Sequence, residues 1–573
     1  MVADQLCQRN SCGSLGGALP DDPLTPLQVV DLPVSNGIRL FPNPCVPVRL
    51  TVRVHYRICG MFIDLRVVPD GTDITAEVCI VGAGAAGITL AREFNGSGLA
   101  CVLLESGGTE FDSRTQELYA GDNIGRPFLD LTTCRLRYFG GTTNHWSGWC
   151  LPLDPIDFET REGLPYRGWP FGRFWLYRWY RRAQEICQVG PFDYAPDHWG
   201  VVQSNLPAPF QGPHFTPRIA QLSPPTRFGS AYEPELQPSS NVTVYLQANA
   251  CKFETNDAGS EVQSLSVRTL TGRSFKVVAK VFVVAAGGIE NARLLLASGQ
   301  TEDQGVGDGK DLIGRFFMTH ICLWAGLLAV ADPPTDFYFD PGYFRTFQDG
   351  SEPRPFVSFV GLSEETMQQR HLPSIKLLWK YETPGAPDAS GLLTDLPSIL
   401  QDIEGRPEYV TGNVFRREGV PVTGPKLFLN LEPTPNPDSR IRLSQERDAI
   451  GMRKVVVDWN VTEEDKRNGA AILRLLGAEV ARTGFGRLRS FLEDGDDEKW
   501  PADMYGDQHH IGTTRMHHDP SLGVVNEDCR VHGVANLYVA GSSVFPTAGA
   551  ANPTLTIVAL ALRLADHLKE ELK

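Results

Sequence analysis

Long apolar runs and a secretory signal are missing from this sequence. Runs such as Ile321–Ala331 stop short of the ~20 apolar residues that a membrane-spanning helix needs. No basic segment followed by an apolar stretch and a small-residue cleavage site stands near the first residues, so they do not resemble an ordinary signal peptide. We therefore expect a soluble protein of the cytoplasm with no membrane span.

Closely spaced cysteine pairs are also absent. None of the 12 cysteines belongs to a Cys-x-x-Cys pair, which argues against a zinc ribbon or a thioredoxin-like motif. Cys79 and Cys101 lie inside apolar runs that resemble strands. We expect them to be buried and reduced, as small apolar residues are in a reducing compartment.

Positive charge is in the minority. The 573 residues include 53 Lys and Arg against 68 Asp and Glu, a net charge of −15. An acidic surface repels nucleic acid and anionic lipid, so we expect a small-molecule partner and no nucleic acid. The hydrophobic fraction of 42% supplies ample core and excludes a wholly disordered chain.

Residues 1–60 show little sustained periodicity and much Gly, Pro and Asn. Val48–Tyr56 alternates apolar and polar residues and predicts one strand. We expect the folded protein to begin near Met61. The preceding residues are then a partly disordered arm, or they follow from a start codon placed too early.

A strand–helix–strand unit is predicted after this extension. Glu77–Val81 becomes a continuous apolar run after its first residue, which is typical of a buried parallel strand. Ala85–Phe94 is rich in helix formers, and Leu99–Leu104 is a second apolar run.

A glycine motif joins the first strand to the helix. It reads Gly82-Ala-Gly84-Ala-Ala-Gly87, in which Gly82 permits a tight turn, Gly84 lets a pyrophosphate approach and Gly87 lets the helix pack on the strand. Glu105 ends the second strand, where a carboxylate would accept hydrogen bonds from a ribose. FAD and NAD share this pattern. We favour FAD because no second strand–glycine–helix unit is evident, Gly305–Gly309 lacking a preceding strand.

The remaining pattern is coarser. Arg173–Glu185 predicts a helix, and Asn241–Val284 predicts a series of short strands. Glu463–Arg482 and Thr554–Leu572 predict two further helices, while the acidic run Asp494–Glu498 predicts a solvated turn.

Several further motifs resemble those of one enzyme family, the glucose–methanol–choline (GMC) oxidoreductases. The resemblance is nearest to the bacterial and pyranose-oxidase-like branch and covers roughly residues 70–573. The segments that carry it, beside the glycine motif, are Gly140–Gly148, Val283–Arg293, His509–Met516, Leu537–Ser543 and Gly549–Thr554.

The resemblance implies an α/β fold in which a discontinuous, Rossmann-like FAD-binding domain carries an inserted α+β substrate domain. The antiparallel sheet of the inserted domain would roof the flavin. The implied division is an N-terminal extension at 1–69, FAD-binding parts at 70–150, 241–320 and 501–573, and substrate-domain parts at 151–240 and 321–500.

The resemblance also implies the catalytic residues. In the family, the histidine of a His-x-x-Gly-Thr motif takes the hydroxyl proton, and here that residue is His509, with His510 pointing elsewhere. Histidine suits this task because its ordinary pKa lies near neutrality. Asn552 would hydrogen-bond the substrate oxygen, or it would only cap the helix that Pro553 begins.

A metal centre is the alternative for the histidines of this region. His509, His510, His517 and His518 lack a His-Glu-x-x-His pattern and a carboxylate in helical register. We therefore expect no metal.

His145 allows two interpretations. In pyranose-oxidase-like members a histidine at this place is covalently joined to the flavin, whereas a side chain that packs beside the ring is the simpler reading. The other implied FAD contacts, some of which could equally be sheet packing, are Gly82, Gly84, Ala85, Ala86, Gly87, Glu105, Gly141, Thr142, Asn144, Ala250, Cys251, Ala286, Gly287, Gly541, Asn552, Pro553 and Thr554.

The resemblance thus implies an enzyme, an FAD-dependent oxidoreductase that oxidises the CH–OH group of an alcohol to a carbonyl. A sugar, a glycoside or a natural-product intermediate is the substrate class that we favour. Oxygen, a quinone or a carrier protein would accept the electrons. The alternatives are a hydroxynitrile lyase-like enzyme and a non-catalytic flavoprotein on the same fold.

Overall fold

Parallel strands carry the glycine motif of this protein. The computed structural model describes residues 62–126, 128–164, 166–224, 226–300, 304–330, 345–347, 354–380, 425–492 and 499–573. The chain divides into residues 1–56 and 57–573, and all described residues lie in the second unit. The strand predicted at 48–56 and the turn predicted at 494–498 lie outside the described residues.

Eight of the described strands form the first sheet, in the order β1-β7-β3-β2-β10-β9-β8, with β20 paired to β10. β1, β7, β3, β2, β10 and β20 run parallel, and β9 pairs antiparallel with β10 and β8. The strands are β1 (Phe62–Asp64), β2 (Asp73–Val81), β3 (Cys101–Leu104), β7 (Val242–Leu246), β8 (Asn249–Thr255), β9 (Val262–Arg268), β10 (Ser274–Val284) and β20 (Leu537–Val539).

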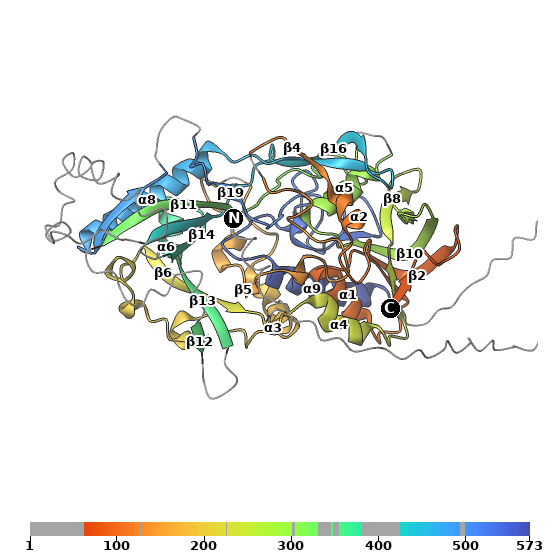
Figure 1. Cartoon of the computed structure of the whole chain (residues 1–573), viewed down its shortest axis with the longest axis horizontal. Helices are drawn as coiled ribbons and strands as arrows, with labels where there is room; N and C mark the ends of the chain where they lie inside the picture. Colours follow the sequence, from red (N-terminus) through yellow and green to blue (C-terminus); the bar gives the residue numbers. More distant parts are fainter. Residues whose placement is uncertain are drawn as a thin grey trace, which may run out of the picture. The chain divides into compact units, whose positions relative to one another are not determined.

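The predicted strand–helix–strand unit is confirmed. α1 (Ala85–Phe94) follows β2 and leads to β3, which pairs parallel with β2. Near the other end of the chain, α9 (Thr554–Glu571) packs on α1, and Figure 1 shows the two helices beside each other close to β2. Sequence segments about 460 residues apart, from Phe94 to Thr554, therefore support one sheet.

The expectation that no second strand–glycine–helix unit exists is wrong. β10 ends at Val284, and α5 (Gly288–Ala297) begins after the turn at Gly287, where φ is 91°. A Cβ atom at Gly82 would lie 2.7 Å from the carbonyl oxygen of Ala285. The two glycine turns touch each other, so they form one site rather than two.

Nine described strands form a second, antiparallel sheet in the order β18-β11-β15-β14-β13-β6-β5, with β12 and β19 attached. The antiparallel arrangement agrees with the prediction. The strands are β5 (Trp149–Cys150), β6 (Phe215–Leu222), β11 (Ile321–Val330), β12 (Arg345–Phe347), β13 (Arg354–Leu362), β14 (Ile375–Lys380), β15 (Lys426–Leu431), β18 (Gly486–Ser490) and β19 (Tyr505–Gly506).

A small sheet and the other helices complete the described part. β16 (Arg440–Arg447) and β17 (Arg453–Asp458) form a hairpin that β4 (Gly121–Asn123) extends. The remaining helices are α2 (Ser113–Gln116), α3 (Tyr177–Ile186), α4 (Phe228–Leu236), α6 (Glu364–Arg370) and α8 (Glu463–Arg482). α8 packs on β18, and it begins at a capping box formed by Thr462 and Asp465.

The strands cross the predicted domain boundaries at a few places. β1 belongs to the parallel sheet although 1–69 was predicted as an extension, and β5 and β19 belong to the antiparallel sheet rather than to FAD-binding parts. The division into six segments otherwise stays a prediction.

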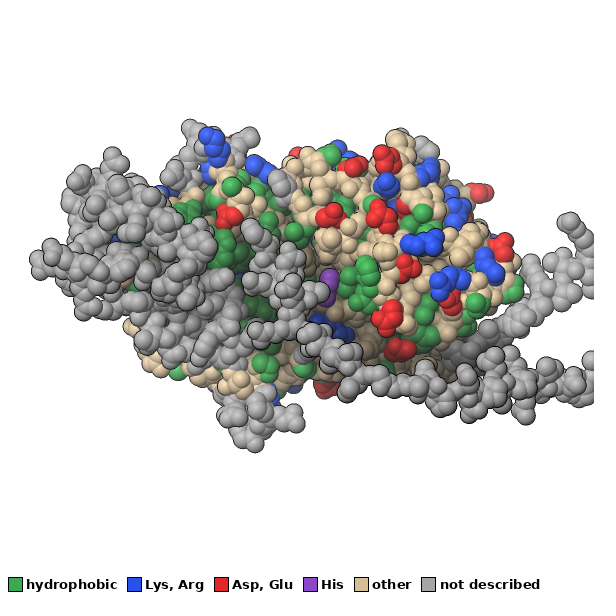
Figure 2. All heavy atoms as spheres, viewed as in Figure 1, with side chains coloured by type: hydrophobic (Ala, Val, Ile, Leu, Met, Phe, Trp, Pro, Cys, Tyr) green, Lys and Arg blue, Asp and Glu red, His purple; other side chains and the backbone are tan. Residues whose placement is uncertain are grey.

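The described cysteines are all buried and unpaired, which confirms the prediction for Cys79 and Cys101. Within the described ranges, no helix is long and apolar enough to cross a bilayer, and the location in the cytoplasm stays a prediction. On the described part of the face drawn in Figure 2, acidic and basic side chains are interspersed rather than gathered into one basic patch.

Candidate active site

The carboxyl ends of the parallel strands gather most of the predicted cofactor residues. Ligands of open α/β sheets bind at this edge. Asn291 joins two of the segments, because its Oδ1 accepts a hydrogen bond from the N–H of Ala286 at 2.7 Å and its Nδ2 donates to the carbonyl of Ala540 at 3.0 Å. Gly541, with φ of 112°, follows directly.

The three glycines of the first turn have different surroundings. A Cβ atom at Gly87 would lie 1.8 Å from the carbonyl oxygen of Gly82, so only glycine lets the helix approach the strand. A Cβ atom at Gly84 would meet nothing within 4 Å. Gly84 therefore presents bare backbone to open space, which is what a close approach by a ligand requires.

Glu105 supports this turn from the end of β3. Its Oε2 accepts a hydrogen bond from the N–H of Ala83 at 3.0 Å, and its Oε1 accepts one from the N–H of Gly107 at 2.9 Å. The carboxylate is thereby held at the edge of the sheet. Its predicted contact with a ribose stays a prediction.

The loop that contains His145 lies on the glycine turn. The N–H of Gly140 donates to the carbonyl of Ala83 at 2.9 Å, and a Cβ atom at Gly141 would lie 3.0 Å from the Cα of Gly84. Thr142 and Asn144 follow in the same short 3-10 helix, and the next residue, His145, is exposed.

Ala250 and Cys251 are placed less directly. They lie near the start of β8, and the N–H of Ala248, two residues earlier, donates to the carbonyl of Glu105 at 2.8 Å. Their contact with a cofactor stays a prediction.

This edge fits a dinucleotide. No side chain caps the N-terminal residue Gly84 of α1 or Pro553 of α9, so both helix ends leave backbone N–H groups for another acceptor. Gly287, like Gly84, faces open space where a Cβ atom would stand. Two uncapped helix ends and two bare backbone positions suit a pyrophosphate and a second electron-rich group.

Strand pairing places His509 opposite His320. β19 pairs with the start of β11, and Met318 pairs with Ile511 a few residues away. The Nδ1 atoms of His320 and His509 lie 2.9 Å apart, and Oδ2 of Asp507 lies 3.1 Å from Nδ1 of His509.

Asn552 completes the cluster on the other side of His509. Its Nδ2 lies 3.2 Å from Nε2 of His509, and its Oδ1 accepts a hydrogen bond from Nζ of Lys376 at 2.7 Å. Because this side chain contacts Lys376 and His509, the alternative that Asn552 caps α9 is wrong.

A row of hydrogen bonds links Lys376, Asn552, His509, His320 and Gly549. Their directions are fixed because the group at each end of the row can play only one role. The ammonium of Lys376 only donates, so Oδ1 of Asn552 faces it and Nδ2 donates to Nε2 of His509. At the other end the carbonyl of Gly549 only accepts, so Nε2 of His320 carries a hydrogen and donates to it at 2.8 Å. His509 therefore carries its hydrogen on Nδ1, which points to His320 and Asp507, and its unprotonated Nε2 accepts the hydrogen bond of Asn552.

The surroundings favour this neutral form of His509. Burial lowers its pKa, Asp507 opposes this effect, and Lys376 adds to it, so the pKa lies below the ordinary value. Burial, the neighbouring His509 and Lys376 lower the pKa of His320 to about 3. Burial also lowers the pKa of Lys376, to about 8.

The four histidines considered as a metal cluster do not gather. The ring of His510 packs against Phe128 and Phe317, and His517 stacks on His518. Among the described residues, ligand-type atoms of His320, Asp507 and His509 do lie within 4.8 Å of one another. Hydrogen bonds account for these short distances, and the absence of a metal stays a prediction.

Sequence reasoning missed His320, Lys376 and Asp507. His320 and Lys376 are each an ionisable residue next to apolar strand residues, in Met-Thr-His-Ile-Cys-Leu and Ser-Ile-Lys-Leu-Leu. A charge inside such a run is seldom fully buried without a role, so this signal was available. Asp507 stands two residues before the predicted base.

A cavity of about 730 Å³ lies beside two of the segments that carry the cluster, and none of the cluster's own side chains lines it. Its lining includes Ala550 and Ala551, which precede Asn552, and Ser374 and Ile375, which precede Lys376. The cavity therefore reaches the backbone beside both polar side chains.

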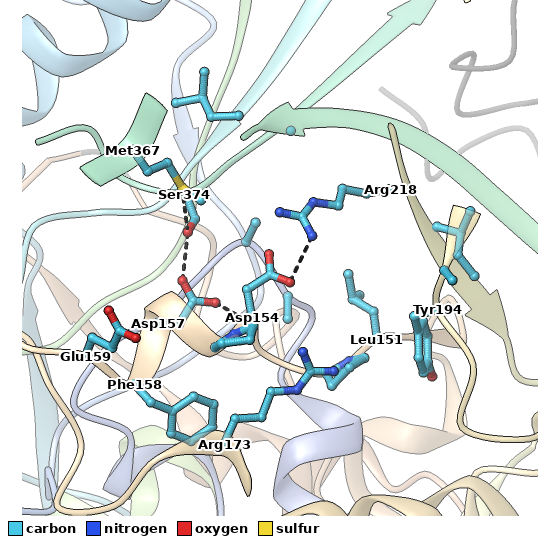
Figure 3. A pocket seen from close by; sticks show the side chains of 18 of the residues that line it. Leu151, Asp154, Asp157, Phe158, Glu159, Arg173, Tyr194, Arg218, Met367 and Ser374 are labelled. Atoms are coloured by element: carbon cyan, nitrogen blue, oxygen red, sulfur yellow. Dashed lines mark hydrogen bonds and ion pairs between the residues drawn. The ribbon is translucent and has the colours of Figure 1, made fainter. Parts of the chain in front are cut away.

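Charged and aromatic side chains converge on the cavity. Figure 3 shows Asp154 paired with Arg218 at 3.1 Å, Asp157 accepting a hydrogen bond from Ser374 at 2.7 Å, and Arg173 and Tyr194 on other sides. Burial and the nearby Glu432 raise the pKa of Asp157 to about 7. The lining can donate and accept many hydrogen bonds.

A parallel sheet with bare glycine turns, set beside a histidine whose Nε2 is unprotonated, has the features that a dinucleotide-dependent oxidoreductase would need. Residues 435–561 match the family model described as GMC oxidoreductase. The resemblance to this family that the motifs predicted is confirmed, and the prediction of an enzyme agrees with relatives named as an oxidase and a dehydrogenase. The chain's place in the pyranose-oxidase-like branch stays a prediction.

Curated relatives match along most of the chain. It is 26% identical over 562 residues to 6'''-hydroxyparomomycin C oxidase of Streptomyces lividus, with 87% of this chain and 93% of that protein covered. It is 24% identical over 584 residues to the fructose dehydrogenase large subunit of Gluconobacter japonicus, with 87% and 99% covered. The solved structure of a fungal aryl-alcohol oxidase covers 87% of this chain and 99% of its own at a TM-score of 0.53 and 14% identity, a likeness of fold.

Proposed function

We propose that this protein is an FAD-dependent oxidoreductase that oxidises the CH–OH group of an alcohol to a carbonyl. One observation carries the proposal. Nε2 of His509 is unprotonated and lies 3.2 Å from an amide donor of Asn552, and a cavity lies beside the segment that carries Asn552. A base and a donor in this arrangement can both reach one hydroxyl group.

FAD would bind at the carboxyl edge of the parallel sheet. Gly82, Gly84 and Gly87 with the N-terminus of α1 would hold the pyrophosphate, and Glu105 a ribose. The N-terminus of α9 would face the part of the ring that becomes negative. When bound, FAD supplies the acceptor for the hydride that leaves the carbinol carbon.

The chain itself moves the proton. His509 accepts the hydroxyl proton at Nε2, and Nδ2 of Asn552 donates to the oxygen as its negative charge grows. The resulting imidazolium keeps its Nδ1 hydrogen toward Asp507, whose carboxylate 3.1 Å away stabilises the positive charge.

A sugar or a glycoside is the substrate class that we propose. The matched relatives are named as an oxidase of 6'''-hydroxyparomomycin C and a dehydrogenase of fructose. The carboxylates, guanidinium groups and aromatic rings around the cavity suit a ligand with many hydroxyl groups. Its reacting end would lie beside Asn552, and the rest would occupy the cavity.

Anaerobic reduction of the bound flavin tests this function. A panel of sugars, glycosides and simple alcohols is mixed with the holoprotein, and the flavin absorption band is followed. We expect bleaching by at least one sugar-like alcohol, and a rate lower by ~100-fold or more in His509→Ala, with the flavin content unchanged. His518→Ala, which removes an exposed histidine, is the matched control and should behave as the wild type.

The alternatives give other results. A flavin band that no alcohol bleaches supports a non-catalytic flavoprotein, and release of cyanide from a cyanohydrin without bleaching supports a hydroxynitrile lyase-like enzyme. Oxygen, a quinone or a carrier protein is then added to the reduced enzyme. The compound that restores the band fastest is the electron acceptor.

Attachment of the cofactor to His145 is tested separately. We propose that FAD is bound without a covalent bond, so acid precipitation should leave the yellow colour in the supernatant. Colour that stays in the pellet of the wild type but not of His145→Ala would show attachment through this exposed side chain.

A further inference from the structure

Lys376 is an ammonium group that the described protein pairs incompletely. It lies in β14 and is only 3% exposed. With the described residues it makes one hydrogen bond, to Oδ1 of Asn552 at 2.7 Å, and its Nζ lies 5.6 Å from the centre of the Trp149 ring. Burying a charge without a carboxylate partner is costly, so we expect the buried ammonium of Lys376 to have a function.

The antiparallel sheet directs the side chain of Lys376 toward the candidate active site. Lys376 pairs with Asn430 of β15, and Asn430 pairs in turn with Cys322 of β11, so the three side chains share one face of the antiparallel sheet. That face meets Asn552, since Nζ of Lys376 reaches its side chain. The lysine thus enters from the antiparallel sheet, while His509 and Asn552 come from the last segment of the chain.

We propose, on the basis of the proposed function, that Lys376 is a positioning residue whose ammonium group fixes the Asn552 amide and so secures, together with His320 and Asp507, the tautomer of His509. An ammonium cannot accept a hydrogen bond, so the amide has one allowed orientation, with Nδ2 toward His509. A histidine that receives a hydrogen bond at Nε2 carries its own hydrogen at Nδ1. Only this tautomer can take a proton from a substrate at Nε2.

Without the ammonium, the amide loses this constraint. Rotation of the Asn552 side chain would place Oδ1 against Nε2 of His509, and the favoured tautomer would then carry a hydrogen there. His320 and Asp507 oppose this change, because the carboxylate and the unprotonated Nδ1 of His320 both need a hydrogen on Nδ1 of His509. Without the ammonium the two ends of the row compete, and part of the molecules would hold the base protonated at Nε2, where it cannot accept the hydroxyl proton.

The positive charge of Lys376 also favours the unprotonated form of His509. The charged and titratable groups around His509 are the carboxylate of Asp507, the imidazoles of His320 and His510, and this ammonium, with Cys322 and Tyr505 next to them. Asp507 favours the protonated form of His509 and Lys376 disfavours it.

Two substitutions separate hydrogen-bond direction from charge. Lys376→Met removes the donor and the charge, whereas Lys376→Gln removes the charge but keeps an N–H donor for Asn552. Lys280→Met, which removes an exposed lysine from β10, is the control. Each full-length holoprotein is assayed for FAD content and for the rate of anaerobic flavin reduction against pH.

We expect Lys376→Met to lower the plateau rate by ~100-fold and Lys376→Gln by less than ~10-fold, both with full FAD content. In both variants the acid limb of the pH–rate profile should move to higher pH, because the positive charge that lowers the pKa of His509 is gone. A plateau rate and an acid limb equal to those of the wild type in Lys376→Met would overturn the proposal, as would equal losses in the two variants.

A second substitution covers the case in which Lys376→Met does not fold. Asn552→Asp places an acceptor against Nε2 of His509, so its rate should fall at least ~100-fold with FAD retained. A rate near that of the wild type overturns the proposal. If no alcohol reduces the wild type, the proposed function fails instead, so the two failures are distinct.

Discussion

His509 works as a base only while its Nε2 is unprotonated. Burial and Lys376 hold its pKa below the ordinary value of about 6.5, against the opposing effect of Asp507. The neutral form therefore persists as the pH falls through 6.5, and the rate falls only at lower pH. We predict that the acid limb of the flavin-reduction rate lies below pH 6.5, measured by stopped-flow mixing from pH 5 to 9. A limb at or above pH 6.5 would contradict this environment.

Asp507 should shift that limb in the direction opposite to Lys376. Its carboxylate, 3.1 Å from Nδ1 of His509, stabilises the protonated imidazole. We predict that Asp507→Asn moves the acid limb to still lower pH and slows reduction, because the imidazolium formed on proton transfer loses its counter-charge. The pH profile of this variant checks the direction, and a shift to higher pH would disprove the assignment.

Metal removal provides a third test at this scale. The hydrogen bonds among His320, Asp507 and His509 account for their proximity without an ion. We predict that dialysis against a chelator leaves the turnover rate unchanged and that metal analysis finds no stoichiometric cation. Loss of turnover that zinc or another divalent cation restores would show that these side chains bind a metal.

The motif at the end of the chain was sufficient to predict the positions of His509 and Asn552 but not their neighbours. His320 reaches His509 because β11 pairs with β19, and Lys376 reaches Asn552 because β14 lies inside the antiparallel sheet. Strand register between segments more than 150 residues apart is not encoded in any local pattern. A buried ionisable residue in an apolar strand was the available clue, and it does not name a partner.

At the scale of elements, two glycines of the turn before α1 have different roles, one in binding the cofactor and one in folding. A Cβ atom at Gly84 meets nothing within 4 Å, whereas one at Gly87 would overlap the carbonyl of Gly82. We predict that Gly84→Ala keeps the thermal stability of the apoprotein but binds FAD more weakly. Gly87→Ala should fail to fold or should melt many degrees lower. Spectroscopic FAD titration and thermal melts distinguish them, and equal behaviour of the two variants would argue against the assigned site.

Elements with strong local signals were predicted closely. α1 and α8 have the predicted limits, Ala85–Phe94 and Glu463–Arg482, because a glycine turn and a capping box mark their starts. The turn after β10 was recognised as a segment but not as a second strand–glycine–helix unit. Its Ala-Ala-Gly-Gly sequence differs from the first motif, although the backbone at Gly287 makes a similar turn.

At the scale of the whole molecule, a buried ion network joins distant segments. Glu432 of the segment after β15 is fully buried. It forms an ion pair with Arg167 at 2.6 Å and accepts a hydrogen bond from the N–H of Gly549 at 2.9 Å. Gly549 in turn accepts the hydrogen bond of His320. The network thus connects the antiparallel sheet to the loop that carries Asn552.

Removal of one partner from this network should be costly. We predict that Arg167→Met destabilises the protein by about 3–5 kcal/mol, because it leaves the buried carboxylate of Glu432 undercompensated. The exposed Arg178→Met serves as the control. Chemical unfolding measures the difference, and equal stability of the two variants would contradict the structural role of this pair.

The class of fold was predictable from sequence because the glycine motif and the terminal motifs stand at the two ends of one sheet. The limits of the domain segments were harder to predict from the sequence. β1, β5 and β19 join sheets across the predicted boundaries, since a strand of two or three residues has no pattern of its own and takes its place from its neighbours.

Proton transfer to His509 is the central claim, and the pH dependence of flavin reduction in His509→Ala tests it most directly. Without the imidazole, the alcohol must ionise into solvent before its hydride can leave. The account predicts a slow rate that rises about tenfold per pH unit over the alkaline range, as hydroxide replaces the missing base. A rate that equals the wild type and does not change with pH would contradict it.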